Sequence, residues 1–272
     1  VDFYPAAMQS RLVSLLDRVG EPVAPSVATT PRGAAPAAFD AATRTTAAPL
    51  SAFGYYRVGE DGRLYLATKS EHYHTPLGHG FPGYDLLDRA RRLGIPNATH
   101  NNTRGAITRR LEEALIRAAN GLAADDDAGL RDVLARRGDL FTLNRVINLE
   151  TGSLAAEAAL KFCLARFIRI QDDAPAPVHA GRVPVFLVMG DQDGGLRGNY
   201  HGTTVLTQLL RGMWPGLAAA LAEAGLLKVV AIRPNCSGDL ARAFAEYEKP
   251  PFKIAGFFHE IILMNYGAVV LE

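Results

Sequence analysis

Three short apolar segments, separated by helical patterns, constrain the second half of the chain most strongly. Val183–Met189, Lys228–Ile232 and Ile254–Phe258 are apolar runs of strand length. Continuous apolar runs are typical of strands that are covered on both faces. Helical patterns lie before and between them, at Gly152–Arg169, within Thr203–Ala224 and at Asp239–Tyr247. This order predicts an α/β fold, with a mostly parallel sheet flanked by helices.

The first half of the chain has a different pattern and predicts a small α+β segment. Its centre is a hairpin with strand-like pieces at Phe53–Val58 and Arg63–Leu66, joined by Glu60-Asp61-Gly62, because Asp-Gly between β-prone pieces favours a tight turn. The five prolines of 21–50 predict either an extended arm that cannot sustain a helix or a linker. Expected helices are 7–19, Tyr84–Leu93 and Ala106–Asn120, and the acidic run Asp125–Asp127 is expected to be a solvated loop.

Composition narrows the functional classes. The 272 residues have a net charge of +1, and 48% of them are hydrophobic. This near-neutral balance gives no electrostatic reason to expect binding to nucleic acid or to an anionic membrane. The two cysteines, Cys163 and Cys236, form neither a disulfide framework nor a metal-binding spacing. No apolar run reaches membrane-spanning length, so we expect a cytoplasmic protein.

Thr151-Gly152-Ser153 opens the helix expected from Gly152. The free N–H groups and the dipole of a helix N-terminus favour a phosphate, and the hydroxyl of Ser153 adds a donor. An ordinary helix cap, without any ligand, is the competing interpretation.

The segment from Asp191 to Thr204 follows an expected strand and therefore lies at the carboxyl edge of the sheet, where α/β proteins bind ligands. Asp191 and Asp193 lack the further ligands of a calcium loop. Tyr200-His201-Gly202 is a candidate for stacking an aromatic ring on a planar cofactor, and Tyr200 as a simple packing residue is the alternative.

His72, His74 and His79 suggest zinc, but no fourth ligand has suitable spacing, and we expect no metal. The chain also lacks a Walker loop, a G-x-S-x-G elbow and an H-E-x-x-H motif.

In their order along the chain, these segments resemble the class III aminotransferases of the ornithine and 4-aminobutyrate type, which are pyridoxal-phosphate enzymes of fold type I. Thr151-Gly152-Ser153 with Ala155, Glu157, Ala159 and Lys161 is similar to the family's phosphate-binding helix, and Tyr200-His201-Gly202 matches its aromatic-H-G. The early motif is matched by Asp61–Leu66, Ser70, Leu77-Gly78-His79 and Pro82, and Glu260 falls at the Glu of E-P-x-Q. The resemblance covers about residues 51 to 272.

The resemblance implies roles for individual residues. Gly152 and Ser153 would hold the phosphate of pyridoxal 5'-phosphate, and Tyr200 would stack on its ring. His201 and Glu260 would line the cofactor pocket. The family completes its active site across a homodimer interface. The substrates would be an amine or amino acid and a 2-oxo acid or aldehyde, with Glu71, His72 and Tyr73 on the substrate side.

Several positions depart from the family pattern. The family places a Schiff-base lysine, preceded by an aspartate, downstream of the E-P motif. The lysines of this chain, Lys69, Lys161, Lys228, Lys249 and Lys253, do not match that position. We therefore expect the catalytic pair to lie beyond Glu272, and the chain to be an N-terminal portion that is inactive without its complement. The other departures are Ala67, Glu71, Glu150, Leu154, Ile261, Leu263 and Asn265.

These observations predict three regions and one leading function. Residues 1–50 would form an N-terminal helix and arm, 51–139 part of the small domain and the entry to the large domain, and 140–272 part of the cofactor-binding large domain. The leading hypothesis is a pyridoxal-phosphate-dependent transaminase. An aminomutase or lyase of the same fold, and a non-catalytic binding module, remain as alternatives.

Overall fold

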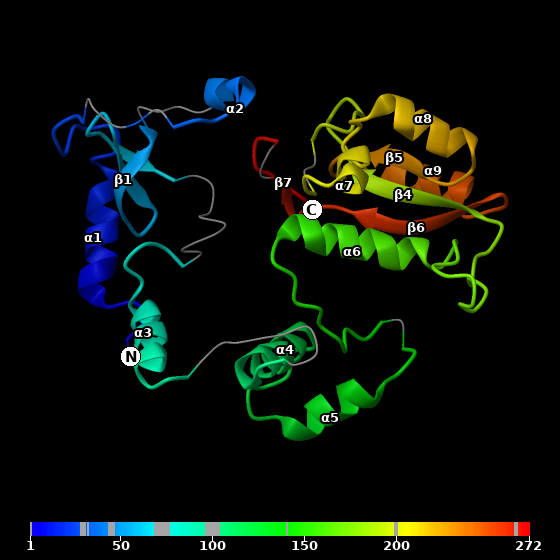
Figure 1. The fold of residues 1–272 in the computed structure, drawn as a ribbon, viewed down its shortest axis with the longest axis horizontal. Helices are drawn as coiled ribbons and strands as arrows, with labels where there is room; N and C mark the ends of the chain where they lie inside the picture. The colour runs from blue at the N-terminus through cyan, green and yellow to red at the C-terminus, as the bar shows by residue number, and fades with distance from the viewer. Residues whose placement is uncertain are drawn as a thin grey trace. The chain divides into compact units, whose positions relative to one another are not determined.

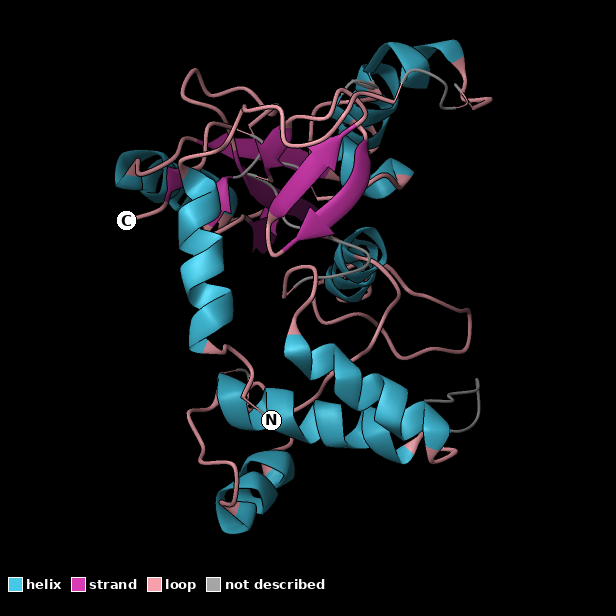
Figure 2. Cartoon of the chain, turned by 90° about the vertical axis from the view of Figure 1, so that its left-hand side faces the viewer, coloured by secondary structure: helices cyan, strands magenta, loops and turns pink. Residues whose placement is uncertain are grey.

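The computed structural model describes residues 2–27, 31, 33–42, 47–67, 77–95, 104–139, 141–198, 201–263 and 266–272. The chain divides into two compact units, Val1–Leu111 and Glu112–Glu272, which are described separately. Figure 1 labels the elements of both units, and Figure 2 draws their strands in magenta. In the part of the chain that the structure describes, no helix is long and apolar enough to cross a membrane.

The first unit contains a three-stranded antiparallel sheet in the order β1-β2-β3. The predicted Asp61-Gly62 turn is confirmed, because it joins β2 to β3 and Gly62 adopts a φ of +77°. The piece predicted at Phe53–Val58 is divided at Gly54 and Tyr55 between two strands. The elements of this unit are α1 (Ala6–Leu16), α2 (Ala37–Ala42), β1 (Pro49–Phe53), β2 (Tyr56–Gly59), β3 (Leu64–Leu66), the 3₁₀ turn η2 (Pro82–Tyr84), α3 (Asp85–Arg92) and the start of α4 (Ala106–Ala119).

The proline-rich stretch begins as an extended arm along this sheet. The Val23 N–H donates to the Gly62 carbonyl over 2.9 Å, and the Val27 N–H donates to the Glu60 carbonyl over 2.7 Å. The expectation that residues 21–50 form no helix is wrong at α2. Residues 37–42 contain no proline and four alanines, and alanine has the highest helix propensity.

The second unit is built around a parallel sheet in the order β5-β4-β6. β4 (Val183–Met189) and β5 (Lys228–Ile232) have the predicted bounds, and β6 (Phe252–Phe258) begins two residues earlier than predicted. Val185 lies opposite both Lys228 of β5 and Ile254 of β6, so β4 is the central strand. A small antiparallel ladder pairs β7 (Ile262–Leu263) with β8 (Val269–Val270).

Helices cover both faces of this sheet, which confirms the predicted α/β class (Figure 1). Phe186 and Val188 of β4 pack with Leu160 of α6 (Gly152–Leu164), and side chains of α7 (Val205–Leu209) and α8 (Pro215–Glu223) join the same cluster. On the opposite face, Val185 and Leu187 pack against α9 (Ser237–Tyr247). Alternate residues of β4 thus fill both cores, as its continuous apolar sequence requires.

Three sequence predictions for this unit are corrected. The helix expected over Gly152–Arg169 ends at Leu164. The single helix expected within Thr203–Ala224 is two helices, because the chain turns at Trp214, with a φ of +58°, before Pro215. Asp125–Asp127 is not simply a solvated loop. The Asp126 carboxylate accepts from the Gly129 N–H over 2.8 Å and caps α5 (Asp127–Ala135), while Asp127 pairs with the buried Arg117 of α4.

Candidate functional site

The first turn of α6 presents unused hydrogen-bond donors. Thr151 precedes the helix in extended backbone, and its hydroxyl accepts from the Leu154 N–H over 3.2 Å. Within the described ranges, the N–H groups of Gly152 and Ser153 have no hydrogen-bond acceptor in the chain. Together with the partial positive charge of the helix end, these two N–H groups form a place for an anion.

The segment that follows Tyr200 lies directly against this turn. The Thr203 N–H donates to the Ser153 hydroxyl oxygen over 3.1 Å, and the two hydroxyl oxygens are 3.5 Å apart. Gly202 has a φ of +144°, and a Cβ added there would lie 2.8 Å from both Cα and Oγ of Ser153. Only glycine permits this approach, so Gly202 brings two distant parts of the sequence into one site.

Thr204 fixes the segment one helical turn further along α6. Its hydroxyl donates to Glu157 Oε2 over 2.7 Å, and its oxygen also accepts from the Thr207 N–H at the start of α7. Thr203 and Thr204 had no predicted role at the site. Two adjacent threonines between a glycine and the apolar start of a helix are the signal that would have indicated a capping position.

His201 lies at the carboxyl end of β6. Its ring packs edge-on against Phe258, with the ring centres 5.8 Å apart. Burial, and to a smaller extent the nearby His259, lower the pKa of His201 to about 4. The imidazole is therefore neutral at pH 7, and its buried Nε2 has no hydrogen-bond partner among the described residues.

The depressed pKa of His201 predicts a pH-dependent loss of stability. The unfolded chain takes up this proton near pH 6.5 and the folded chain only near pH 4, so the folded state loses stability as the pH falls between these values. Urea titrations monitored by the single tryptophan, Trp214, should show a smaller acid-induced loss for His201→Gln than for the unmodified chain. An identical pH dependence in both proteins would contradict this assignment.

The structure brings together only some of the residues expected at the site. Gly152, Ser153 and His201 lie at the carboxyl edge of the sheet, and Glu260 follows the end of β6 by two residues. Tyr200, Glu71, His72 and Tyr73 lie outside the described residues. His79 lies in the first unit, where its backbone exchanges two hydrogen bonds with Gly54. Within the described ranges, no three His, Cys, Asp or Glu side chains are grouped so as to hold a metal ion.

Comparisons with known proteins give one structural match to report. No family model and no curated protein matches the chain. A solved structure of taurine:2-oxoglutarate aminotransferase from Bifidobacterium kashiwanohense, in complex with PLP and glutamate, superposes with a TM-score of 0.40 at 20% identity. The match covers 79% of this chain and 42% of that one.

Proposed function

We propose that this chain provides the cofactor phosphate site of a pyridoxal-phosphate-dependent transaminase of class III. The reaction would move an amino group between an amine or amino acid and a 2-oxo acid or aldehyde. The order of the four sequence motifs supports this proposal, as does the α/β architecture with helices on both faces of a parallel sheet. A two-fold homodimer of fold type I belongs to the same proposal.

The contact between Thr203 and Ser153 carries the proposal. It joins the loop after β4 to the N-terminus of α6. The N–H groups of Gly152 and Ser153 therefore lie beside the hydroxyl groups of Ser153 and Thr203. A phosphate has several acceptor oxygens and a negative charge, and this set of donors at a helix N-terminus is complementary to both. The residues present therefore fit the phosphate of pyridoxal 5'-phosphate.

Each residue would have a separate task at the site. Gly152 and Ser153 would bind the phosphate, and Tyr200 would stack on the ring. The neutral His201 would offer its Nε2 to the cofactor, which would satisfy a polar atom that is otherwise buried without a partner among the described residues. When bound, pyridoxal phosphate supplies an aldehyde for the amino group and a ring that withdraws electrons from the reacting carbon. Glu71, His72 and Tyr73 would contact the substrate.

Equilibrium dialysis of the chain against pyridoxal phosphate, with pyridoxal as the comparison ligand, tests the proposal. Ser153→Ala removes a hydrogen bond to a charged group, worth about 1.5–3 kcal/mol, so pyridoxal phosphate should bind about tenfold or more weakly. Binding of pyridoxal, which lacks the phosphate, should change little.

Ser237→Ala is the matched control, because Ser237 is an exposed serine in the first turn of another helix, α9. It should leave the affinity for pyridoxal phosphate unchanged. Equal affinities of the chain for the two ligands, or equal effects of the two serine substitutions, would refute the phosphate site.

A further inference from the structure

Glu157 is the only charged residue of α6 before Lys161, and its charge is unfavourable for an anion at the start of this helix. It follows Ser153 by four residues, so the two side chains lie one turn apart on the same side of the helix. A carboxylate there offsets the partial positive charge of the helix end and repels a phosphate bound at Gly152 and Ser153. The contacts of Glu157 show what it contributes instead.

The carboxylate of Glu157 binds the loop residue Thr204. The Thr204 hydroxyl donates to Glu157 Oε2 over 2.7 Å. An ionised carboxylate can only accept, so the hydroxyl proton points to Glu157 and the hydroxyl oxygen accepts from the Thr207 N–H over 3.3 Å. The Thr204 carbonyl accepts from the Gln208 N–H over 2.9 Å. Thr204 is therefore bound to both α6 and α7.

This bond and the contact at Ser153 hold the loop at two points. Thr203 donates its N–H to the Ser153 hydroxyl oxygen over 3.1 Å, and the next residue binds Glu157 one turn further along α6. A single hydrogen bond would allow the loop to rotate about it, whereas two bonds to successive turns of one helix fix both its distance and its direction. Gly202 directly precedes these residues, so its position against Ser153 depends on the same two bonds.

We infer that Glu157 is a positioning residue of the phosphate site, which it keeps assembled through Thr204. The inference rests on the function proposed above. It assigns Glu157 two opposing effects on a bound phosphate, because its charge weakens binding and its hydrogen bond strengthens binding by keeping Thr203 on Ser153. The hydrogen bond has the larger effect, since it is short and charge-assisted, while solvent screens the charge of this half-buried side chain.

Two substitutions of Glu157 separate these effects. Glu157→Gln retains an oxygen that accepts from Thr204 but removes the charge, whereas Glu157→Ala removes both. In equilibrium dialysis, Glu157→Ala should bind pyridoxal phosphate about fivefold more weakly than the unmodified chain. Glu157→Gln should bind it at least as tightly as the unmodified chain. A role limited to the interaction of the carboxylate with the helix dipole requires the charge, so glutamine would then fail to replace glutamate.

A double-mutant cycle with Thr204→Val tests whether Glu157 acts through Thr204. This isosteric substitution removes the hydroxyl and with it the cap of α7, so it serves as a background. In that background Glu157→Ala should no longer weaken binding of pyridoxal phosphate, because the bond that it removes is already absent. An equal loss in both backgrounds would show that Glu157 acts independently of Thr204 and would overturn the inference.

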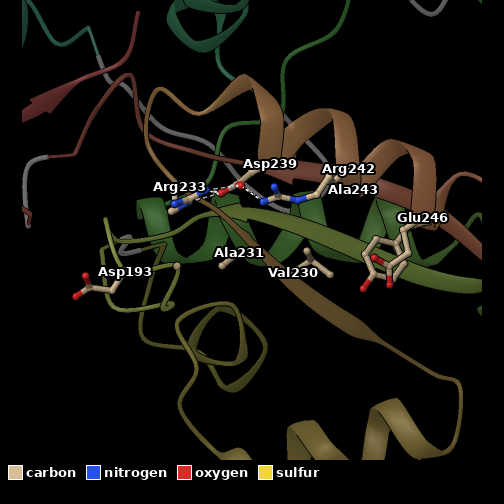
Figure 3. A pocket seen from close by; sticks show the side chains of 10 residues that line it. Asp193, Val230, Ala231, Arg233, Asp239, Arg242, Ala243 and Glu246 are labelled. Atoms are coloured by element: carbon tan, nitrogen blue, oxygen red, sulfur yellow. Dashed lines mark hydrogen bonds and ion pairs between the residues drawn. The ribbon is translucent and has the colours of Figure 1, made fainter.

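Glu246→Ala is the matched control, because it also removes one exposed or half-buried carboxylate from a helix and changes the net charge by the same amount. Glu246 lies on α9, which covers the opposite face of the sheet from α6, and it lines a groove there. Figure 3 shows this groove, with Glu246 at one end and the ion pairs of Asp239 with Arg233 and Arg242 toward the start of α9. The control should leave the affinity for pyridoxal phosphate unchanged.

The comparison ligand separates failure of this inference from failure of the proposed function. Equal affinities of the unmodified chain for pyridoxal phosphate and pyridoxal would refute the phosphate site, and this inference with it. The inference alone would be overturned in a chain that prefers pyridoxal phosphate if Glu157→Ala bound it as tightly as the unmodified chain. The same holds if Glu157→Gln bound it as weakly as Glu157→Ala.

Discussion

Replacing Gly202 with alanine should separate the 201–204 segment from the first turn of α6 and abolish binding of pyridoxal phosphate. The new Cβ would meet the backbone of Ser153 at 2.8 Å, where no side-chain rotation can relieve the clash. The φ of +144° adds a conformational cost of about 1–3 kcal/mol for any residue other than glycine. Equilibrium dialysis would measure the loss of binding, and urea unfolding the loss of stability.

Gly216→Ala provides the matched control for this substitution. Gly216 lies in α8, and a Cβ added there would meet nothing within 4 Å. Alanine should raise the stability of that helix by up to about 1 kcal/mol without affecting the cofactor. A Gly202→Ala protein that still binds pyridoxal phosphate with undiminished affinity would show that the contact between the loop and α6 is not needed.

Replacing Phe186 with alanine should remove about 3–5 kcal/mol of folding free energy, a large part of what a domain usually has. Phe186 lies on the central strand, is fully buried and packs edge-on against Phe258 with ring centres 5.9 Å apart. The same Phe258 ring contacts His201, so the cavity would also loosen the support of the site. Urea unfolding followed through Trp214 measures the change in stability.

Phe162→Ala deletes the same side chain from α6, where it is 61% exposed. This control should cost much less, because an exposed ring gains little from folding. Similar losses for the two variants would mean that the core described around Phe186 does not stabilise the fold as proposed.

The three strands of the parallel sheet were predictable because their local pattern and their burial agree. Val183–Met189 is apolar throughout since both of its faces are covered, and its bounds were predicted to the residue. The break at Trp214 was missed although Gly212, with a φ of +72°, and Pro215, at the first position of α8, mark it in the sequence. The helix that begins at Asp127 was missed because an acidic run is compatible with both a loop and a capped helix start.

The helix start at the candidate site could be predicted from the sequence, but the contacts that assemble the site could not. A Thr-Gly-Ser turn before an alanine-rich helix indicates a helix N-terminus from the sequence alone. That Thr203 donates to Ser153, or that Gly202 must lack a side chain, follows only from the tertiary approach of segments that are distant in the chain. The ion pairs of Asp239 with Arg233 and Arg242 are local in the chain, but no sequence motif marked them.

The central position of β4 has a consequence for the order in which the second unit folds. β4 precedes both of its neighbours in the chain, and β5 is separated from it by a shorter connection than β6. Closing a shorter loop costs less entropy, so β5 should join β4 before β6 does. Phe258 lies at the end of β6, so the contact between its ring and His201 would be among the last to form. A chain in which only β4 and β5 have paired would therefore not yet bury the imidazole of His201.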